Sequence, residues 1–269
     1  MTFRTCEEIP AIDLGWEDEN RNDAGGEGVV IEVTFEDERS RAMVENAGIC
    51  LQIISELVAS ISDNPPEDQM VNSICWQVLR DMKSNLFLSM SGHYRSTFIL
   101  QRGTIDLLGS AVYFADCIKQ NEQEGWEQLT AWINGERDAS PSFSEILGTL
   151  ADVVPWLSES IYTSLREDRE LQNRYVHTPI GGDPFEVLFD DDNNTFLTRT
   201  WTSYYDLNKL KTWYVEFITQ LFYVASINLE YHDNVGPIPA SFDDFMKCYT
   251  DIAGDRTVRG IKTDVEVPL

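Results

Sequence analysis

Runs of apolar residues at helical spacing constrain the fold of this chain more than any other feature. From Ala47 to Ile61, apolar side chains recur every three or four residues, which places them on one face of a helix. Further segments repeat the pattern, and turn-forming stretches such as Asp63 to Pro66 separate them. The sequence therefore predicts a mainly α fold, a bundle of about six or seven helices in one domain.

The expected helices cover residues 36–61, 67–90, 93–120, 122–133, 143–173 with an interruption at Pro155, 203–231 and 241–252. The segment 93–120 is apolar on most sides, so we expect it at the centre of its domain. Its Gly103 and Gly109 would let a neighbouring helix approach closely. Ser203 is the expected N-cap of the segment 203–231, with Asp206 completing an approximate capping box.

The expected domain is framed by less regular ends. Residues 1–35 read as an irregular N-terminal arm, in which the β-branched run 28–35 indicates a short strand. Residues 36–253 form the single helical domain, with a small β-hairpin insertion near 185–201 around an acidic turn. Residues 254–269 are an extended C-terminal tail.

The chain is strongly acidic, with 46 Asp and Glu against 20 Lys and Arg and a formal net charge of -26. The acids are spread along the whole sequence, which favours an adaptation of the entire surface to concentrated salt. In molar salt the Debye length falls to about 3 Å, so self-repulsion is largely screened. We therefore expect a protein of a salt-loving microbe; the alternative is an acidic protein that binds basic partners.

The composition also indicates in which cellular compartment the protein works. No apolar run of about 18 residues is present, and residues 1–8 lack the pattern of a secretory signal. The five cysteines are far apart and form no C-x-x-C pair, which favours reduced thiols. These features predict a cytoplasmic protein that does not bind membranes.

Arg102 and Asp106 lie four residues apart on the apolar segment 93–120, so they face the same side of a helix. One interpretation is a structural ion pair that fixes helix packing. The other is a ligand-binding pocket in which Arg95, Arg102 and Asp106 bind an anion or a nucleotide phosphate.

His177 is the candidate catalytic residue, together with Arg174 and Arg169. These three side chains would act as a general acid and base cluster on phosphodiesters. The alternative is a histidine that caps the end of a helix, where it binds the last carbonyl groups.

The sequence predicts no metal site and no cofactor. The segment Asp190 to Asn194 begins like a calcium loop, but Thr195 replaces the required Gly and Trp201 replaces the closing Glu. Residues 230–233 combine three ligand types without the second Glu-x-x-His of a bundle metal site. No phosphate-binding loop and no dinucleotide-binding motif occurs.

Three short segments resemble the HEPN superfamily and the abortive-infection proteins of prokaryotes: Tyr94-Arg95, Arg102 with Asp106, and Tyr175-Val176-His177. The resemblance implies an α-helical bundle, often dimeric, in a defence or toxin system. Active members are RNases with an Arg and a His at a characteristic spacing. That spacing falls between the two found here, where two residues separate Arg174 from His177 and seven separate Arg169 from it.

Our first hypothesis is a non-catalytic interaction or regulatory module of HEPN-like type, which binds a protein partner or a second copy; the sequence gives no support for nucleic acid. The alternative is an RNase or nucleotide-processing enzyme that uses His177 and the nearby arginines. A third class is an oligomerisation protein with the aromatic segment 213–223 as its seam. An enzyme would gather the candidate side chains in an open cleft, whereas a module would bury Arg102 with Asp106.

Overall fold

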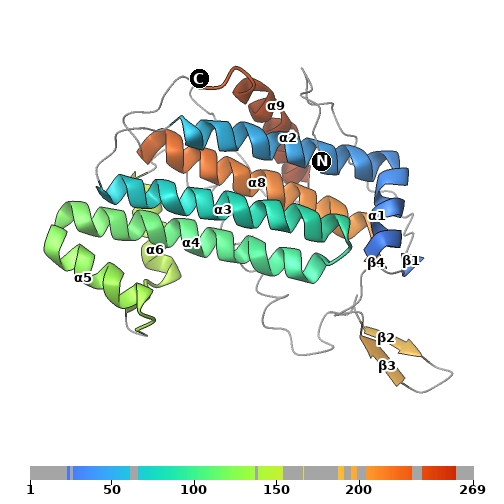
Figure 1. Ribbon diagram of the computed structural model, residues 1–269, viewed down its shortest axis with the longest axis horizontal. Coiled ribbons are helices and arrows are strands. Elements are labelled where there is room, and N and C mark those ends of the chain that lie inside the picture. Colours follow the sequence, from blue (N-terminus) through green and yellow to red (C-terminus); the bar gives the residue numbers. More distant parts are fainter. Residues whose placement is uncertain are drawn as a thin grey trace.

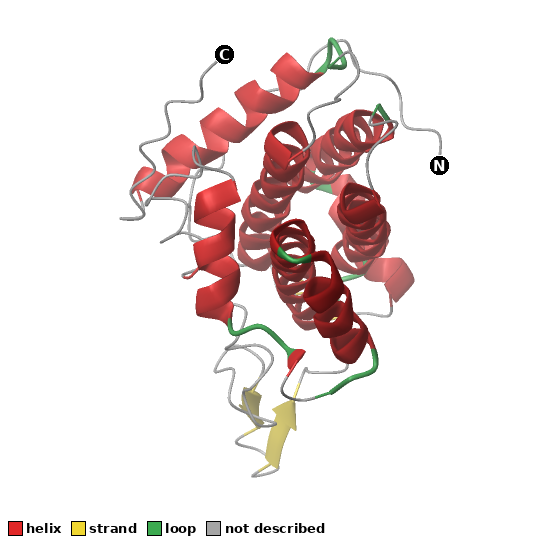
Figure 2. Cartoon of the chain, turned by 90° about the vertical axis from the view of Figure 1, so that its left-hand side faces the viewer, coloured by secondary structure: helices red, strands yellow, loops and turns green. Residues whose placement is uncertain are grey.

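The computed structural model describes residues 23–24, 27–60, 66–136, 139–153, 166, 187–190, 195–198, 204–231 and 238–258. This part of the chain is mainly α, and its long helices pack side by side as a bundle (Figure 1), as the end-on view also shows (Figure 2). The helices are α1 Glu27–Glu36, α2 Glu38–Ala59, α3 Pro66–Met90, α4 Tyr94–Gln120, α5 Glu122–Ile133, α6 Phe143–Val153, α8 Leu207–Tyr231 and α9 Phe242–Val258. The mainly α prediction is confirmed, although these described residues alone form eight helices instead of six or seven.

Helix α8 is the centre of the bundle. Every residue from Trp213 to Asn228 is buried, and α2, α3, α4 and α9 all contact the helix. Helix α4, which the sequence placed at the centre, also packs against four helices, α3, α5, α6 and α8, but it leaves Ile99 exposed to solvent, so α8 is the more completely buried of the two. The burial of α8 was hard to predict from the sequence, because its polar side chains form hydrogen bonds within the helix. The Thr219 hydroxyl donates to the Val215 carbonyl at 2.8 Å, and the Ser226 hydroxyl donates to the Phe222 carbonyl at 2.7 Å.

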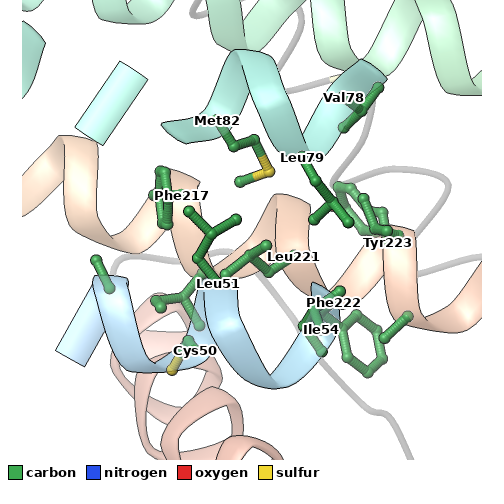
Figure 3. Close-up of a cluster of buried hydrophobic side chains, with 14 of the residues drawn as sticks. Cys50, Leu51, Ile54, Val78, Leu79, Met82, Phe217, Leu221, Phe222 and Tyr223 are labelled. Atoms are coloured by element: carbon green, nitrogen blue, oxygen red, sulfur yellow. The ribbon is translucent and has the colours of Figure 1, made fainter. Parts of the chain in front are cut away.

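The apolar core lies between α2, α3 and α8. Figure 3 shows Leu51 and Ile54 of α2 against Met82 and Leu79 of α3, with Leu221 of α8 between them. Helix α2 is long and apolar enough to cross a membrane by length and composition, but most of it is buried inside the bundle. Its apolar character is thus accounted for by packing.

Hydrogen bonds fix the register of α3, α4 and α8. The indole of Trp213 donates to the Asn85 side-chain oxygen, and the Asn85 amide donates to the Thr97 carbonyl at 2.7 Å. Gln101 donates to the Trp213 carbonyl at 3.3 Å, and Gln220 donates to the Gln101 carbonyl at 2.9 Å. Since these groups are buried, sliding one helix along another would leave several of them unpaired, at about 1–3 kcal/mol each.

The N-terminal segment differs from the prediction, because residues 28–35 form helix α1 and not a strand. Val30 and Thr34 are both buried, and the Thr34 hydroxyl donates to the Val30 carbonyl at 2.8 Å. Packing against α2 and α3 therefore overrides the β preference of the branched side chains. Residues 1–22 of the expected arm lie outside the described residues.

The last long helix begins later than predicted. Tyr204–Tyr205 form strand β4, which pairs antiparallel with β1 at Asp23–Ala24. Helix α8 then begins at Leu207, where the Asp206 carboxylate accepts from the Lys209 backbone N–H at 3.0 Å. Asp206 is thus the N-cap, in place of the Ser203 that the sequence pattern favoured.

Two further boundaries bear on the predictions. Strand β2, Val187–Asp190, pairs antiparallel with β3, Thr195–Thr198. The remaining residues of the expected insertion lie outside the described residues, so the β-hairpin near 185–201 stays a prediction. Near the C-terminal end of the sequence, α9 runs to Val258. The expected extended tail, residues 254–269, therefore begins within a helix.

The two glycines of α4 have different roles. A Cβ built on Gly109 would overlap Cγ2 of Ile146 in α6, so the predicted close approach is confirmed there. A Cβ on Gly103 would meet nothing within 4 Å, so the same prediction is wrong for Gly103. Only Gly109 allows a neighbouring helix to pack against the α4 backbone.

The glycine pair gives a matched stability test by urea denaturation. Gly103→Ala should stabilise the fold by roughly 0.5–1 kcal/mol, because Ala has the higher helix propensity. Gly109→Ala should destabilise it by about 1–3 kcal/mol, because Ile146 must move. Equal effects of the two substitutions would contradict the close packing of α6 on α4.

Candidate functional site

The candidate catalytic residues His177, Arg174 and Arg169 all lie outside the described residues. The acid and base cluster therefore stays a prediction, and so does the alternative that His177 caps a helix.

The candidate ligand-binding residues lie on α4. Arg102 Nε is 3.6 Å from Asp106 Oδ2, with 19% and 36% of the two side chains exposed, so the pair forms at a half-buried position. Arg95 is half-buried near the start of the same helix. An ion pair of this length and exposure contributes at most about 1 kcal/mol, which makes it a weak constraint on packing.

Within the described ranges, no group of three or more His, Cys, Asp or Glu side chains is placed to hold a metal ion. Residues 232 and 233, which belong to one of the motifs weighed for a metal, are not among the described ones. Of the calcium-like segment 190–194, only Asp190 is described, as the end of strand β2.

The aromatic segment 213–223 is not an oligomer seam. Trp213, Tyr214, Phe217, Phe222 and Tyr223 are at most 5% exposed within a single chain. The Phe222 ring stacks on Tyr249 of α9, with centroids 3.9 Å apart. Because this surface is already covered by the chain's own helices, the oligomerisation hypothesis based on it is wrong.

The outer face of α3 carries exposed aromatic and basic side chains in one row, which we call the α3 stripe: Trp76, Arg80, Lys83 and Phe87. Their spacing places them along one side of the helix. Trp76 is 42% exposed and Phe87 is 53% exposed. Among the described residues, no carboxylate forms an ion pair with Arg80 or Lys83.

The charge around the α3 stripe departs from the rest of the chain. Residues 69–115 contain four basic side chains (Arg80, Lys83, Arg95 and Arg102) and two acidic ones (Asp81 and Asp106), a net charge of +2 in a chain of -26. Over the whole of α3 and α4, residues 66–120, five basic and five acidic side chains cancel, so the positive excess is confined to residues 69–115. Charge of this sign attracts an acidic partner and repels a basic one.

Helix α5 carries the complementary surface, the α5 stripe: Glu122, Trp126, Thr130 and Ile133, with Glu127 beside it. All five side chains are exposed, Trp126 at 36% and Ile133 at 69%. Of the six large apolar side chains exposed among the described residues, four belong to the α3 and α5 stripes. One stripe is basic and the other acidic, and each presents two large apolar residues.

Both stripes lie on helices packed against α4. Lys119 Nζ, near the end of α4, is 2.9 Å from Asp68 Oδ1 at the start of α3. Met70 of α3 packs against the cluster in which Phe114 of α4 contacts Leu129 of α5. The beginning of α3 and the inner face of α5 are therefore attached to the same end of α4, which lies between the two helices in Figure 1.

Sequence reasoning missed both stripes. It predicted a helix over 67–90, whose buried side contains Val78 and Met82, without considering the opposite side of that helix. The available signal was Trp76 and Phe87 outside the buried stripe, in a part of the chain where acidic residues become rare. Large aromatic residues off the apolar face are typical of recognition surfaces.

Comparison of the chain with protein-family models, with curated proteins and with solved structures found no match.

The two ion pairs of α3 and α4 should differ in their contribution to stability. Asp68→Ala should cost about 1–3 kcal/mol of unfolding free energy, because Asp68 is buried and 2.9 Å from Lys119. Asp106→Ala should cost less than about 1 kcal/mol, since its pair is longer and half-exposed. Urea unfolding of both variants measures the difference, and a larger loss for Asp106→Ala would show that the Arg102 pair locks the fold.

Proposed function

We propose that this protein is a non-catalytic helical interaction module, which pairs with a second copy of itself through the α3 and α5 stripes. The observation that carries the proposal is the complementarity of the two stripes. A basic aromatic row on α3 and an acidic apolar row on α5 occur in the same chain, so two copies can satisfy both.

A two-fold arrangement uses both stripes in each copy. In an isologous dimer, α3 of one copy contacts α5 of the other, and the symmetry repeats the same contact in reverse. Such a dimer keeps Arg80 and Lys83 away from the equivalent residues of the second copy, which would repel them. Packing α3 against α3 would juxtapose like charges, at a cost of several kcal/mol.

The chemistry of the stripes fits a protein interface. Trp and Arg are the residues most often found as binding hot spots, and Trp76 with Arg80 supplies both on adjacent turns. Apolar burial of Trp76, Phe87, Trp126 and Ile133 remains favourable in concentrated salt, where charge attraction is screened. The charges then select the partner and the register more than they add affinity.

The wider setting belongs to the same proposal. The module is a HEPN-like bundle with a β-hairpin insertion near 185–201, working in the cytoplasm of a salt-loving microbe, with a defence or regulatory role. The acidity of the chain and the resemblance of its short motifs support this setting.

A charge exchange between the stripes tests the pairing. Variant one carries Arg80→Glu and Lys83→Glu, and variant two carries Glu122→Lys and Glu127→Lys. Analytical ultracentrifugation should show a dimer for the wild type and a monomer for each variant alone, because like charges then face each other. An equimolar mixture of the two variants should form a dimer again, since both contacts become attractive.

The experiment is done at the lowest KCl concentration at which circular dichroism shows a folded protein, because salt weakens the charge effect. Lys247→Glu on α9 is the control, as this exposed lysine lies outside both stripes and should leave the dimer unchanged. A monomeric wild type at every protein concentration overturns the proposal, and so does a mixture that stays monomeric.

A further inference from the structure

Two cysteines that are distant in sequence meet where α9 packs on α2. Cys50 of α2 is fully buried and Cys248 of α9 is 8% exposed. Each thiol shifts the pKa of the other, which places the two side chains next to one another where α9 packs on α2. In Figure 3, Cys50 lies on the side of α2 next to the red ribbon of α9.

Polar groups organise the Cys248 sulfur. The Tyr214 hydroxyl lies 3.4 Å from Cys248 Sγ, and the Asn46 side chain is hydrogen-bonded to the same hydroxyl. The Tyr214 hydroxyl of α8 thus contacts the Cys248 sulfur of α9 inside the core. A phenol held in this way can donate to a sulfur that carries negative charge.

The two sulfurs differ in acidity. Hydrogen bonds from Cys50 and then from Tyr214 lower the pKa of Cys248, although burial acts in the opposite direction. The hydrogen bond to Cys248 and then burial raise the pKa of Cys50. Cys248, the sulfur that the Tyr214 hydroxyl contacts at 3.4 Å, is therefore the better placed of the two to carry negative charge and attack, and Cys50 is the resolving thiol.

We propose that Cys50 and Cys248 form a reversible disulfide at the expense of a hydroperoxide, which ties α9 to α2. This modification site is independent of the α3 and α5 stripes.

The chemistry balances in two steps. The Cys248 thiolate attacks the peroxide oxygen, the O–O bond breaks, and the departing oxygen takes the proton that Cys248 had lost. The product is a sulfenic acid on Cys248 and one molecule of water or alcohol. The Cys50 sulfur then attacks the Cys248 sulfur, and hydroxide leaves with the Cys50 proton as water. Overall, the two thiols lose two electrons and the peroxide gains them.

Hydrogen peroxide in molar KCl is the probe. After treatment, the denatured wild type should show three free thiols in place of five, and peptide mapping should place the new bond between Cys50 and Cys248. A dithiol reductant should restore all five. With Cys50→Ser, a sulfenic acid should remain on Cys248 and react with dimedone.

Two variants separate the proposed site from general oxidation. Tyr214→Phe keeps the buried ring and removes the hydroxyl, so disulfide formation should slow by roughly two- to tenfold. Cys75→Ala is the control: Cys75 is buried, accepts a hydrogen bond from Asn228 and has its pKa raised to about 12 by burial. This control should form the Cys50–Cys248 bond at the wild-type rate.

Two results would overturn the proposal. One is a full count of five thiols after peroxide exposure long enough to oxidise methionine. The other is a disulfide that does not join Cys50 to Cys248.

Discussion

The burial of α8 is the constraint on which the rest of the structure depends. A helix enclosed on all sides needs neighbours in every direction, and α2, α3, α4 and α9 supply them. Its polar side chains must then find partners inside the bundle. Thr219 and Ser226 bond to their own helix, while Gln220 and the Trp213 indole bond to groups of α4 and α3. These bonds make the packing of α8 specific as well as apolar.

The proposed interaction surfaces consequently lie at the periphery of the bundle. The aromatic side chains of α8 are buried in the core, so they are not accessible to a partner. The aromatic residues that remain exposed lie outside the buried stripes, above all Trp76 and Phe87 on α3 and Trp126 on α5. Basic residues accompany the first two and acidic residues the third, and under the proposed pairing this difference would favour the contact between α3 and α5.

The helices themselves could be read from the sequence, because apolar spacing and turn residues act locally; the segment 122–133 was predicted with its observed bounds. The features that the sequence did not predict depend on tertiary contacts. Residues 28–35 become helical through the packing of Val30 and Thr34. Gly103 and Gly109 look alike in sequence, and only the position of Ile146 distinguishes them. The pairing of Cys50 with Cys248 spans α2 and α9, and no spacing rule connects residues so far apart.

Hydrogen exchange followed by mass spectrometry, at low and high protein concentration, tests the central claim most directly. The account predicts that amides from Trp213 to Asn228 exchange most slowly at both concentrations, since only global unfolding exposes them. It also predicts that protection of α3 and α5 rises with concentration, while that of α9 does not change. Fast exchange in α8, or concentration-dependent protection confined to other helices, would contradict a bundle built around α8 that works through its outer faces.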